Sequence, residues 1–162
     1  MTDSGGAATE RFHCQACGAP LTQPVVRLPD VPEPRPELDF EGQTSEPTMP
    51  AGFWAFDTEP ATWRPRDQES FDPDEEPGDV ARWQPRGMWN CPLLNLSDLL
   101  DLPPHPDGLR SSGCCGRDGL DGPNVVCPSC ATPVGTVLDD CWTPHEVRLD
   151  PLAVIARPAS RS

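Results

Sequence analysis

The chain has 162 residues, of which 36% are hydrophobic, 23 are proline and 13 are glycine. This length accommodates one domain, and the low apolar and high proline content predict a core smaller than the length would allow. The formal net charge of −14 argues against binding to nucleic acid or to anionic membrane surfaces, because both interactions depend on lysine and arginine. A basic or neutral protein is therefore the expected kind of partner.

Segments that direct a chain into or across a membrane are not found in this sequence. The first ten residues, MTDSGGAATE, lack the apolar stretch of a secretory signal, and no apolar run approaches the ~18 residues of a membrane-spanning helix. A cytoplasmic location is therefore expected. In that reducing compartment, paired cysteines are more often metal ligands than disulfides.

The first half of the chain is predicted to alternate between short strands and irregular proline-rich segments. Residues 1–10 are small and polar and are expected to form a disordered tail. Residues 24–28 and 51–57 are rich in β-branched or aromatic residues and are predicted strands. Residues 29–50 and 58–87 contain many prolines, which remove donors from a β-ladder, so both segments are expected to be irregular.

The second half contains one candidate helix and a group of β-prone runs. Residues 93–102, LLNLSDLLDL, are the best helix candidate, in which Asn95 or Ser97 could cap the first turn. The glycine-rich residues 108–124 are predicted loops. Residues 124–157 contain short β-branched runs separated by turn residues, which predicts a compact β unit.

Two copies of the pattern Trp-x-Pro-Arg, beginning at Trp63 and Trp83, flank the acidic segment 67–79. We interpret both tryptophans as anchors that hold an otherwise loose insertion on the core, with the arginines pairing with local acids or stacking on the rings. The alternative interpretation is that this segment docks onto a partner protein through its tryptophans.

A ten-residue internal repeat carries the strongest chemical signal. Residues 12–21, FHCQACGAPL, and residues 125–134, VVCPSCATPV, share the pattern apolar-x-Cys-x-x-Cys-x-x-Pro-apolar. We call these segments the first and second knuckle. Two residues between the cysteines allow a tight turn that directs both sulfurs at one ion, and two such turns provide a tetrahedral site. The predicted metal ligands are Cys14, Cys17, Cys127 and Cys130.

Four thiolates leave no open coordination position, so this pattern predicts one structural Zn²⁺ ion rather than a catalytic metal. The ion would join two segments that are far apart in the sequence. The alternative is that the two Cys-x-x-Cys pairs act independently, as redox motifs or disulfides.

The other four cysteines allow three interpretations. Cys91, Cys141 and one of the adjacent Cys114 and Cys115 could form a second zinc site with His145, because adjacent residues do not readily both bind one tetrahedral ion. The favoured interpretation is that they are small buried side chains, since free cysteine is among the most buried residue types. A reactive thiol is the third interpretation, with Cys141 as the better candidate.

With both knuckles in view, the chain resembles the β-tent group of zinc proteins, which includes methionine sulfoxide reductase B, the Yippee proteins and the thalidomide-binding domain of cereblon. The resemblance covers FHCQACGAPL and VVCPSCATPVGTVLDD, about 30 residues. The resemblance implies that two distant knuckles share one zinc ion on antiparallel sheets. Of the functional residues of the family, only the zinc ligands have counterparts in this sequence. Cys141 stands in Asp-Asp-Cys-Trp-Thr, where the reductase has Arg-x-Cys-x-Asn, and the adjacent acids are expected to raise its pKa.

The fold class predicted from these features is mostly β, with small zinc-ribbon or β-tent-like antiparallel sheets. Residues 11–157 are expected to form a single zinc-binding domain, with a long acidic, proline-rich insertion at about 29–87. The tails are residues 1–10 and 158–162.

Three functions are compatible with this prediction. The leading hypothesis is a zinc-stabilised, non-enzymatic binding or adaptor protein with a protein partner. The first alternative is a thiol-dependent reductase that resembles methionine sulfoxide reductase B, with Cys141 as nucleophile and Cys114 or Cys115 as the resolving thiol. The second alternative is a zinc or redox sensor that loses its metal on oxidation.

Overall fold

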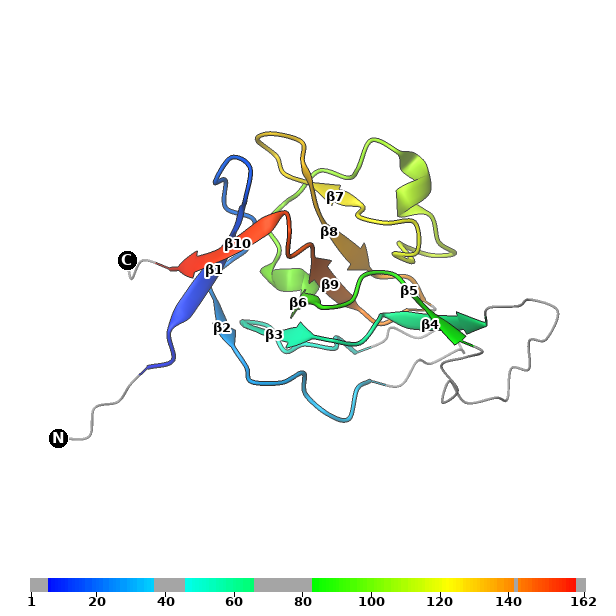
Figure 1. The fold of residues 1–162 in the computed structure, drawn as a ribbon, viewed down its shortest axis with the longest axis horizontal. Coiled ribbons are helices and arrows are strands. Elements are labelled where there is room, and N and C mark those ends of the chain that lie inside the picture. The colour runs from blue at the N-terminus through cyan, green and yellow to red at the C-terminus, as the bar shows by residue number, and fades with distance from the viewer. Residues whose placement is uncertain (1–5, 37–45, 66–82, 142, 160–162) are drawn as a thin grey trace.

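The fold was analysed in a computed structural model, which describes residues 6–36, 46–65, 83–141 and 143–159. Short strands dominate these residues (Figure 1). The strands are β1 (Thr9–Cys14), β2 (Val25–Arg27), β3 (Phe53–Asp57), β4 (Thr62–Pro65), β5 (Trp83–Arg86), β6 (Cys91–Leu94), β7 (Val125–Val126), β8 (Pro133–Leu138), β9 (Glu146–Leu149) and β10 (Val154–Pro158). Two 3₁₀ helices, η2 (Leu96–Asp98) and η3 (Gly108–Ser111), complete the set, and the described residues contain no α-helix.

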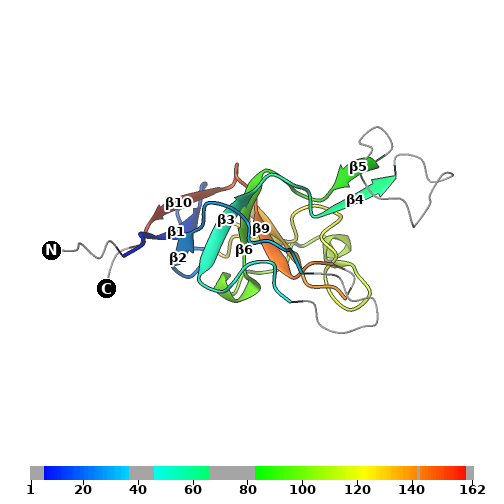
Figure 2. The same ribbon diagram turned by 90° about the horizontal axis from the view of Figure 1, so that it is seen from below.

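Eight of the strands form one sheet in the order β10-β1-β2-β3-β6-β9-β8-β7. The sheet curls into a half-barrel, with β10, β1 and β2 at one end of the molecule (Figures 1 and 2). The prediction of a mostly β fold is confirmed. The prediction of purely antiparallel sheets is wrong at one pair, because β2 and β3 run parallel. The long connection between these two strands provides the crossover that a parallel pair requires.

β4 and β5 form a separate two-stranded sheet that projects from the half-barrel (Figure 2). Its two strands are the two Trp-x-Pro-Arg repeats, paired antiparallel with Trp63 opposite Pro85 and Pro65 opposite Trp83. The expectation that 58–87 is irregular throughout is therefore wrong at these strands. The acidic segment 67–79 and the side chains of both tryptophans lie outside the described residues, so the docking and anchoring interpretations stay predictions.

The predicted helix over 93–102 is also wrong. Its first residues belong to β6, whose four side chains are all buried between β3 and β9, and only η2 follows. A short apolar run bounded by prolines fits a fully buried strand as well as a helix, so periodicity could not separate the two. The predicted capping residue is confirmed, because Asn95 Oδ1 accepts from the Ser97 backbone N–H over 2.9 Å.

The strands predicted near both ends of the chain are confirmed, and they meet each other. β10 pairs with β1 along its whole length, so the last strand closes onto the first. β1 begins at Thr9 and β10 ends at Pro158, so each strand extends into a segment expected to be a tail. Phe12 of β1 and Trp54 of β3 pack edge to face, with ring centroids 5.0 Å apart, within the main core cluster.

The described residues include no helix that is long and apolar enough to span a membrane.

Candidate metal centre

The two knuckles have the same backbone structure. In the first knuckle the Cys14 N–H donates to the Ala19 carbonyl oxygen over 2.8 Å, and in the second the Cys127 N–H donates to Thr132 over 2.8 Å. The spacing of five residues is identical in both. The first knuckle begins within β1, and the second runs from β7 into the start of β8. The internal repeat in the sequence therefore corresponds to a repeated structural unit.

Each knuckle also turns at the same position. Gly18 donates to the Cys14 carbonyl oxygen over 2.8 Å, and Ala131 donates to Cys127 over 2.9 Å. Both turning residues have positive φ, 80° at Gly18 and 60° at Ala131. Glycine adopts this conformation without strain, whereas alanine is strained by its Cβ. The second knuckle thus accepts a strained residue to keep its two sulfurs directed the same way.

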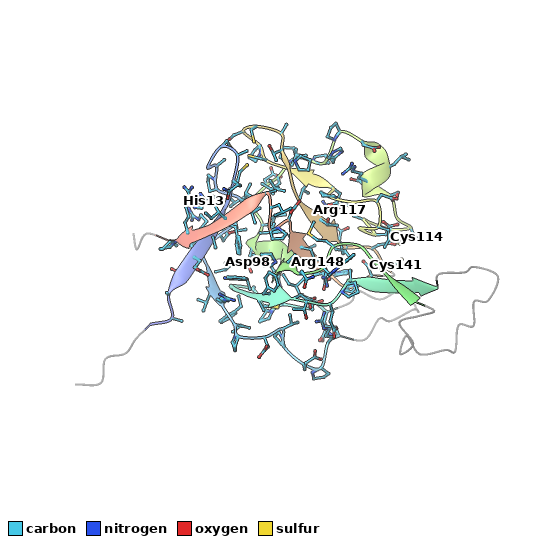
Figure 3. The ribbon with its side chains drawn as sticks, in the orientation of Figure 1. His13, Asp98, Cys114, Arg117, Cys141 and Arg148 are labelled. Carbon is cyan, nitrogen blue, oxygen red and sulfur yellow. The ribbon has the colours of Figure 1, made fainter. Side chains whose placement is uncertain are left out.

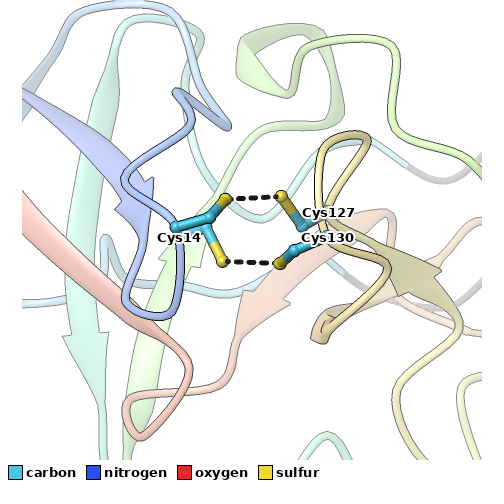
Figure 4. Close-up of side chains that lie close together, drawn as sticks. Cys14, Cys127 and Cys130 are labelled. Carbon is cyan, nitrogen blue, oxygen red and sulfur yellow. Dashed lines mark hydrogen bonds between the residues drawn. The ribbon is translucent and has the colours of Figure 1, made fainter.

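The two knuckles bring four sulfur atoms together, as the close-up in Figure 4 shows. The Sγ atoms of Cys14 and Cys130 lie 3.6 Å apart, and those of Cys17 and Cys127 lie 3.5 Å apart. All four sulfurs lie within 4.8 Å of one another. A zinc ion with four thiolates at about 2.3 Å separates its sulfurs by about 3.8 Å. The set, which we call the four-sulfur site, therefore has the donors and spacing to hold a metal ion.

The surroundings of the four sulfurs shift the pKa values of their thiols in different directions. Hydrogen bonds from Thr132 lower the pKa of Cys130 to about 6. The backbone N–H of Ala19 stabilises the thiolate of Cys17, but contacts with the other three thiols together with burial outweigh this bond and raise the pKa of Cys17 to about 12. Four sulfurs this close cannot all ionise without a cation between them. The Thr132 hydroxyl, 3.1 Å from the Cys130 sulfur, is a contributor that the cysteine spacing alone did not predict.

The position of the four-sulfur site explains what a bound ion would do to the fold. Cys14 and Cys127 are buried in the main core cluster, while Cys17 and Cys130 face solvent. In the sheet order, β1 is separated from β8 by β2, β3, β6 and β9. The curl of the sheet brings these distant strands together, and the knuckles meet across the open side of the half-barrel. An ion there would join the two sides.

A second group of thiols forms where the sequence predicted a four-ligand zinc site. Cys114, Cys115 and Cys141 place their sulfurs within 4.8 Å of one another, and we call this group the three-sulfur cluster. Both adjacent cysteines place their sulfurs in this group, whereas the expectation that at most one of them binds a tetrahedral ion stays a prediction. Contact with Cys115 and the charge of Asp140 raise the pKa of Cys141 to about 12, which confirms the predicted direction.

The other two members of the predicted second zinc site lie elsewhere. Cys91 is fully buried in β6, and burial raises its pKa to about 11. It is separated from the three-sulfur cluster, as is His145, whose backbone pairs with Pro47. Cys91 therefore fits the interpretation of a small buried side chain, and the proposed set with His145 is wrong.

Comparison of the chain with protein-family models, curated proteins and solved structures gives no significant match. The resemblance to the β-tent group therefore rests on the two knuckles, and the relationship stays a prediction. What the described residues establish is a curled, mostly β sheet with a four-cysteine cluster able to hold a metal ion.

Proposed function

We propose that this protein is a zinc-stabilised, non-enzymatic binding or adaptor protein, in which one Zn²⁺ ion in the four-sulfur site holds the fold together. The observation that carries the proposal is the convergence of four sulfurs from two matching knuckles, 3.5 to 3.6 Å apart in pairs. Four thiolates complete a tetrahedral shell, so the zinc would have no position for substrate. Its contribution would be to stability rather than to chemistry.

The energetic scale supports a structural role for the ion. Zinc binding to small modules is worth about 10–16 kcal/mol, whereas the whole net stability of a domain is about 5–15 kcal/mol. Among the described residues, the main core cluster has 13 buried members, two of which are predicted zinc ligands. In this proposal the ion therefore decides whether the sheet closes.

The charge of the chain supports a protein partner. At −14 the molecule repels nucleic acid and anionic lipid, and it attracts basic surfaces. In this proposal the adaptor presents its acidic surface to a basic or neutral protein while the metal keeps that surface folded.

Metal analysis tests the proposal directly. Protein purified without added metal is expected to contain zinc, and the double variant Cys14→Ser, Cys127→Ser is expected to lose one zinc per chain together with its cooperative unfolding transition. Cys91→Ser is the matched control, because it removes a thiol outside both sulfur groups. An unaltered zinc content in the double variant would overturn the proposal.

The thiol-reductase alternative has one observation in its favour. The Sγ atoms of Cys115 and Cys141 lie 3.1 Å apart, a distance suited to a nucleophile and its resolving thiol. The two thiols would reduce a sulfoxide to a thioether, forming one disulfide and one water. The raised pKa of Cys141 opposes this role, because the thiolate is the nucleophile. A sulfoxide-reduction assay comparing the wild type with Cys141→Ser separates the two functions.

A further inference from the structure

The three-sulfur cluster lies where the Gly-Cys-Cys-Gly loop, residues 113–116, meets the segment after β8. Figure 3 shows Cys114 and Cys141 beside each other on the side of the molecule away from His13, and Arg117 nearby. Two of the three cysteines are exposed and Cys141 is partly exposed. The cluster is therefore open to solvent and separate from the four-sulfur site.

Asp140 holds the loop in place from the opposite segment. Its carboxylate accepts hydrogen bonds from three consecutive backbone N–H groups, at 3.3 Å from Cys114, 2.6 Å from Cys115 and 2.9 Å from Gly116. Asp140 itself is buried, and these bonds lower its pKa although burial would raise it. Because both carboxylate oxygens accept hydrogen bonds from the backbone, Asp140 positions the cysteines rather than acting as a metal ligand.

The loop is tightly packed, both within itself and against the segment of Asp139. A Cβ atom at Gly113 would overlap the carbonyl oxygen of Gly116, and a Cβ at Gly116 would lie 2.6 Å from the backbone oxygen of Asp139. The next residue, Arg117, forms a 2.6 Å ion pair with Asp139. Backbone packing, the Asp140 bonds and this ion pair together fix both cysteines of the loop against Cys141.

The donor set consists of three sulfurs. Among the described histidine, cysteine and carboxylate side chains, only those of Cys114, Cys115 and Cys141 place their ligand atoms within 4.8 Å of one another here. Thiolate sulfur is a soft donor that favours Cu(I), zinc and iron–sulfur clusters. Structural zinc sites and iron–sulfur clusters take four protein ligands, and a zinc ion with three protein ligands needs a water molecule to complete its shell. Cu(I) accepts three-coordination, so three thiolate sulfurs complete its shell without a further ligand.

We propose that the three-sulfur cluster is a second metal site, which binds one Cu(I) ion through Cys114, Cys115 and Cys141. Each thiol releases its proton to solvent as its sulfur binds the ion, and no electron is transferred. The site differs from the four-sulfur site in exposure, because all three of its sulfurs belong to residues at the surface. An ion bound there can exchange with solvent or with another thiol ligand.

Anaerobic titration with Cu(I) tests this site in the zinc-loaded full chain. A chromophoric Cu(I) chelator reports copper affinity, and a zinc indicator reports any zinc that is displaced. The expected result is one Cu(I) bound per chain without zinc release, with three sulfur neighbours by X-ray absorption. Cys114→Ser, Cys115→Ser and Cys141→Ser are each expected to weaken this binding at least tenfold, whereas the control Cys91→Ser leaves it unchanged.

Three outcomes would overturn the proposal. The first is unchanged copper affinity in Cys114→Ser, which would reduce the site to two sulfurs. The second is release of one zinc for the first copper bound, which would place the copper in the four-sulfur site. The third is equal loss of copper binding in Cys91→Ser. Circular dichroism of each variant verifies that it is folded. A further variant, Asp140→Asn, keeps all three thiols and is expected to weaken copper binding because it disorders the loop.

Discussion

Arg148 donates to the Asp57 carboxylate over 2.8 Å, and both side chains are almost completely buried, at 1% and 2% exposure. Arg148 lies in β9 and Asp57 at the end of β3, on either side of β6. Arg148 also binds Glu146 over 2.6 Å, and Arg35 forms two hydrogen bonds to Asp57. Arg148, Arg35, Asp57 and Glu146 thus form a buried ion network across the middle of the sheet.

Removal of Arg148 is expected to destabilise the protein by about 3–5 kcal/mol, because it leaves a buried acid without its partner. Arg148→Met retains much of the side-chain volume and removes the charge, so the loss reports the ion network rather than a cavity. Urea unfolding of the zinc-loaded protein measures the change. Arg157→Met is the control, since Arg157 is exposed on the edge strand β10. Equal stabilities of the two variants would contradict this prediction.

The same network predicts a dependence of stability on pH. Burial alone would raise the pKa of Asp57, but hydrogen bonds from Arg35 and the charge of Arg148 hold it below its usual value. The unfolded chain, with an Asp pKa of about 3.9, therefore takes up the proton first as the pH falls. The stabilisation by Asp57 is fully present above about pH 4 and is lost as the pH falls towards the folded-state pKa.

Urea unfolding of the wild type and of Asp57→Asn, from neutral to acid pH, tests whether the stabilisation by Asp57 decreases as the pH falls. The difference in unfolding free energy is expected to be largest at neutral pH and to shrink on acidification. Both proteins are measured over the pH range in which a zinc indicator shows the metal still bound, because acid release of the ion is expected to abolish the folding transition. A difference that stays constant to the lowest pH of that range would contradict a lowered Asp57 pKa in the folded state.

The four-sulfur site could be predicted from the sequence because each half of it is contained in one ten-residue segment. Within each knuckle the local turn directs two sulfurs at one point, and the repeated pattern indicated that both knuckles share this turn. The three-sulfur cluster depends on where the loop at Cys115 meets the segment at Cys141, which is a property of the sheet topology. Cys91 stands between the knuckles in the sequence, as Cys115 does, but it lies in the central strand β6 instead.

The buried ion network escaped prediction for the same reason. Glu146 and Arg148 alternate with apolar residues in β9, a pattern that normally marks a solvent-facing side of a strand. In the structure all four residues of β9 are buried, because partners from other segments cover the polar side. The sequence separation of Arg148 from Asp57 is 91 residues, so no local pattern connects them.

The strained residue in the second knuckle predicts a stabilising substitution. Ala131 has a φ of 60°, whereas its counterpart Gly18 has a φ of 80°. Ala131→Gly is expected to increase the unfolding free energy by about 0.5–1 kcal/mol, because relief of strain exceeds the added entropy of unfolded glycine. Gly18→Ala is expected to reduce it by about 1 kcal/mol, although a Cβ there meets no atom within 4 Å. Changes of the same sign in both variants would contradict the equivalence of the knuckles.

Oxidation of the metal-free three-sulfur cluster is expected to link Cys115 to Cys141. Their Sγ atoms are 3.1 Å apart, and the Asp140 bonds hold the Cys115 backbone in position for this contact. One hydrogen peroxide molecule would convert the two thiols into a disulfide and two waters. Peptide mapping by mass spectrometry, on zinc-loaded protein treated with mild peroxide, identifies the pair.

Cys141→Ser is expected to abolish this disulfide and leave Cys115 open to alkylation. Cys91→Ser is expected to have no effect, because the Cys91 thiol is buried and its pKa is raised to about 11. Zinc-bound thiolates in the four-sulfur site are expected to react more slowly, since the ion holds their electron pairs. A first disulfide between Cys14 and Cys17, or loss of zinc before any link between Cys115 and Cys141, would instead favour the zinc-releasing redox sensor.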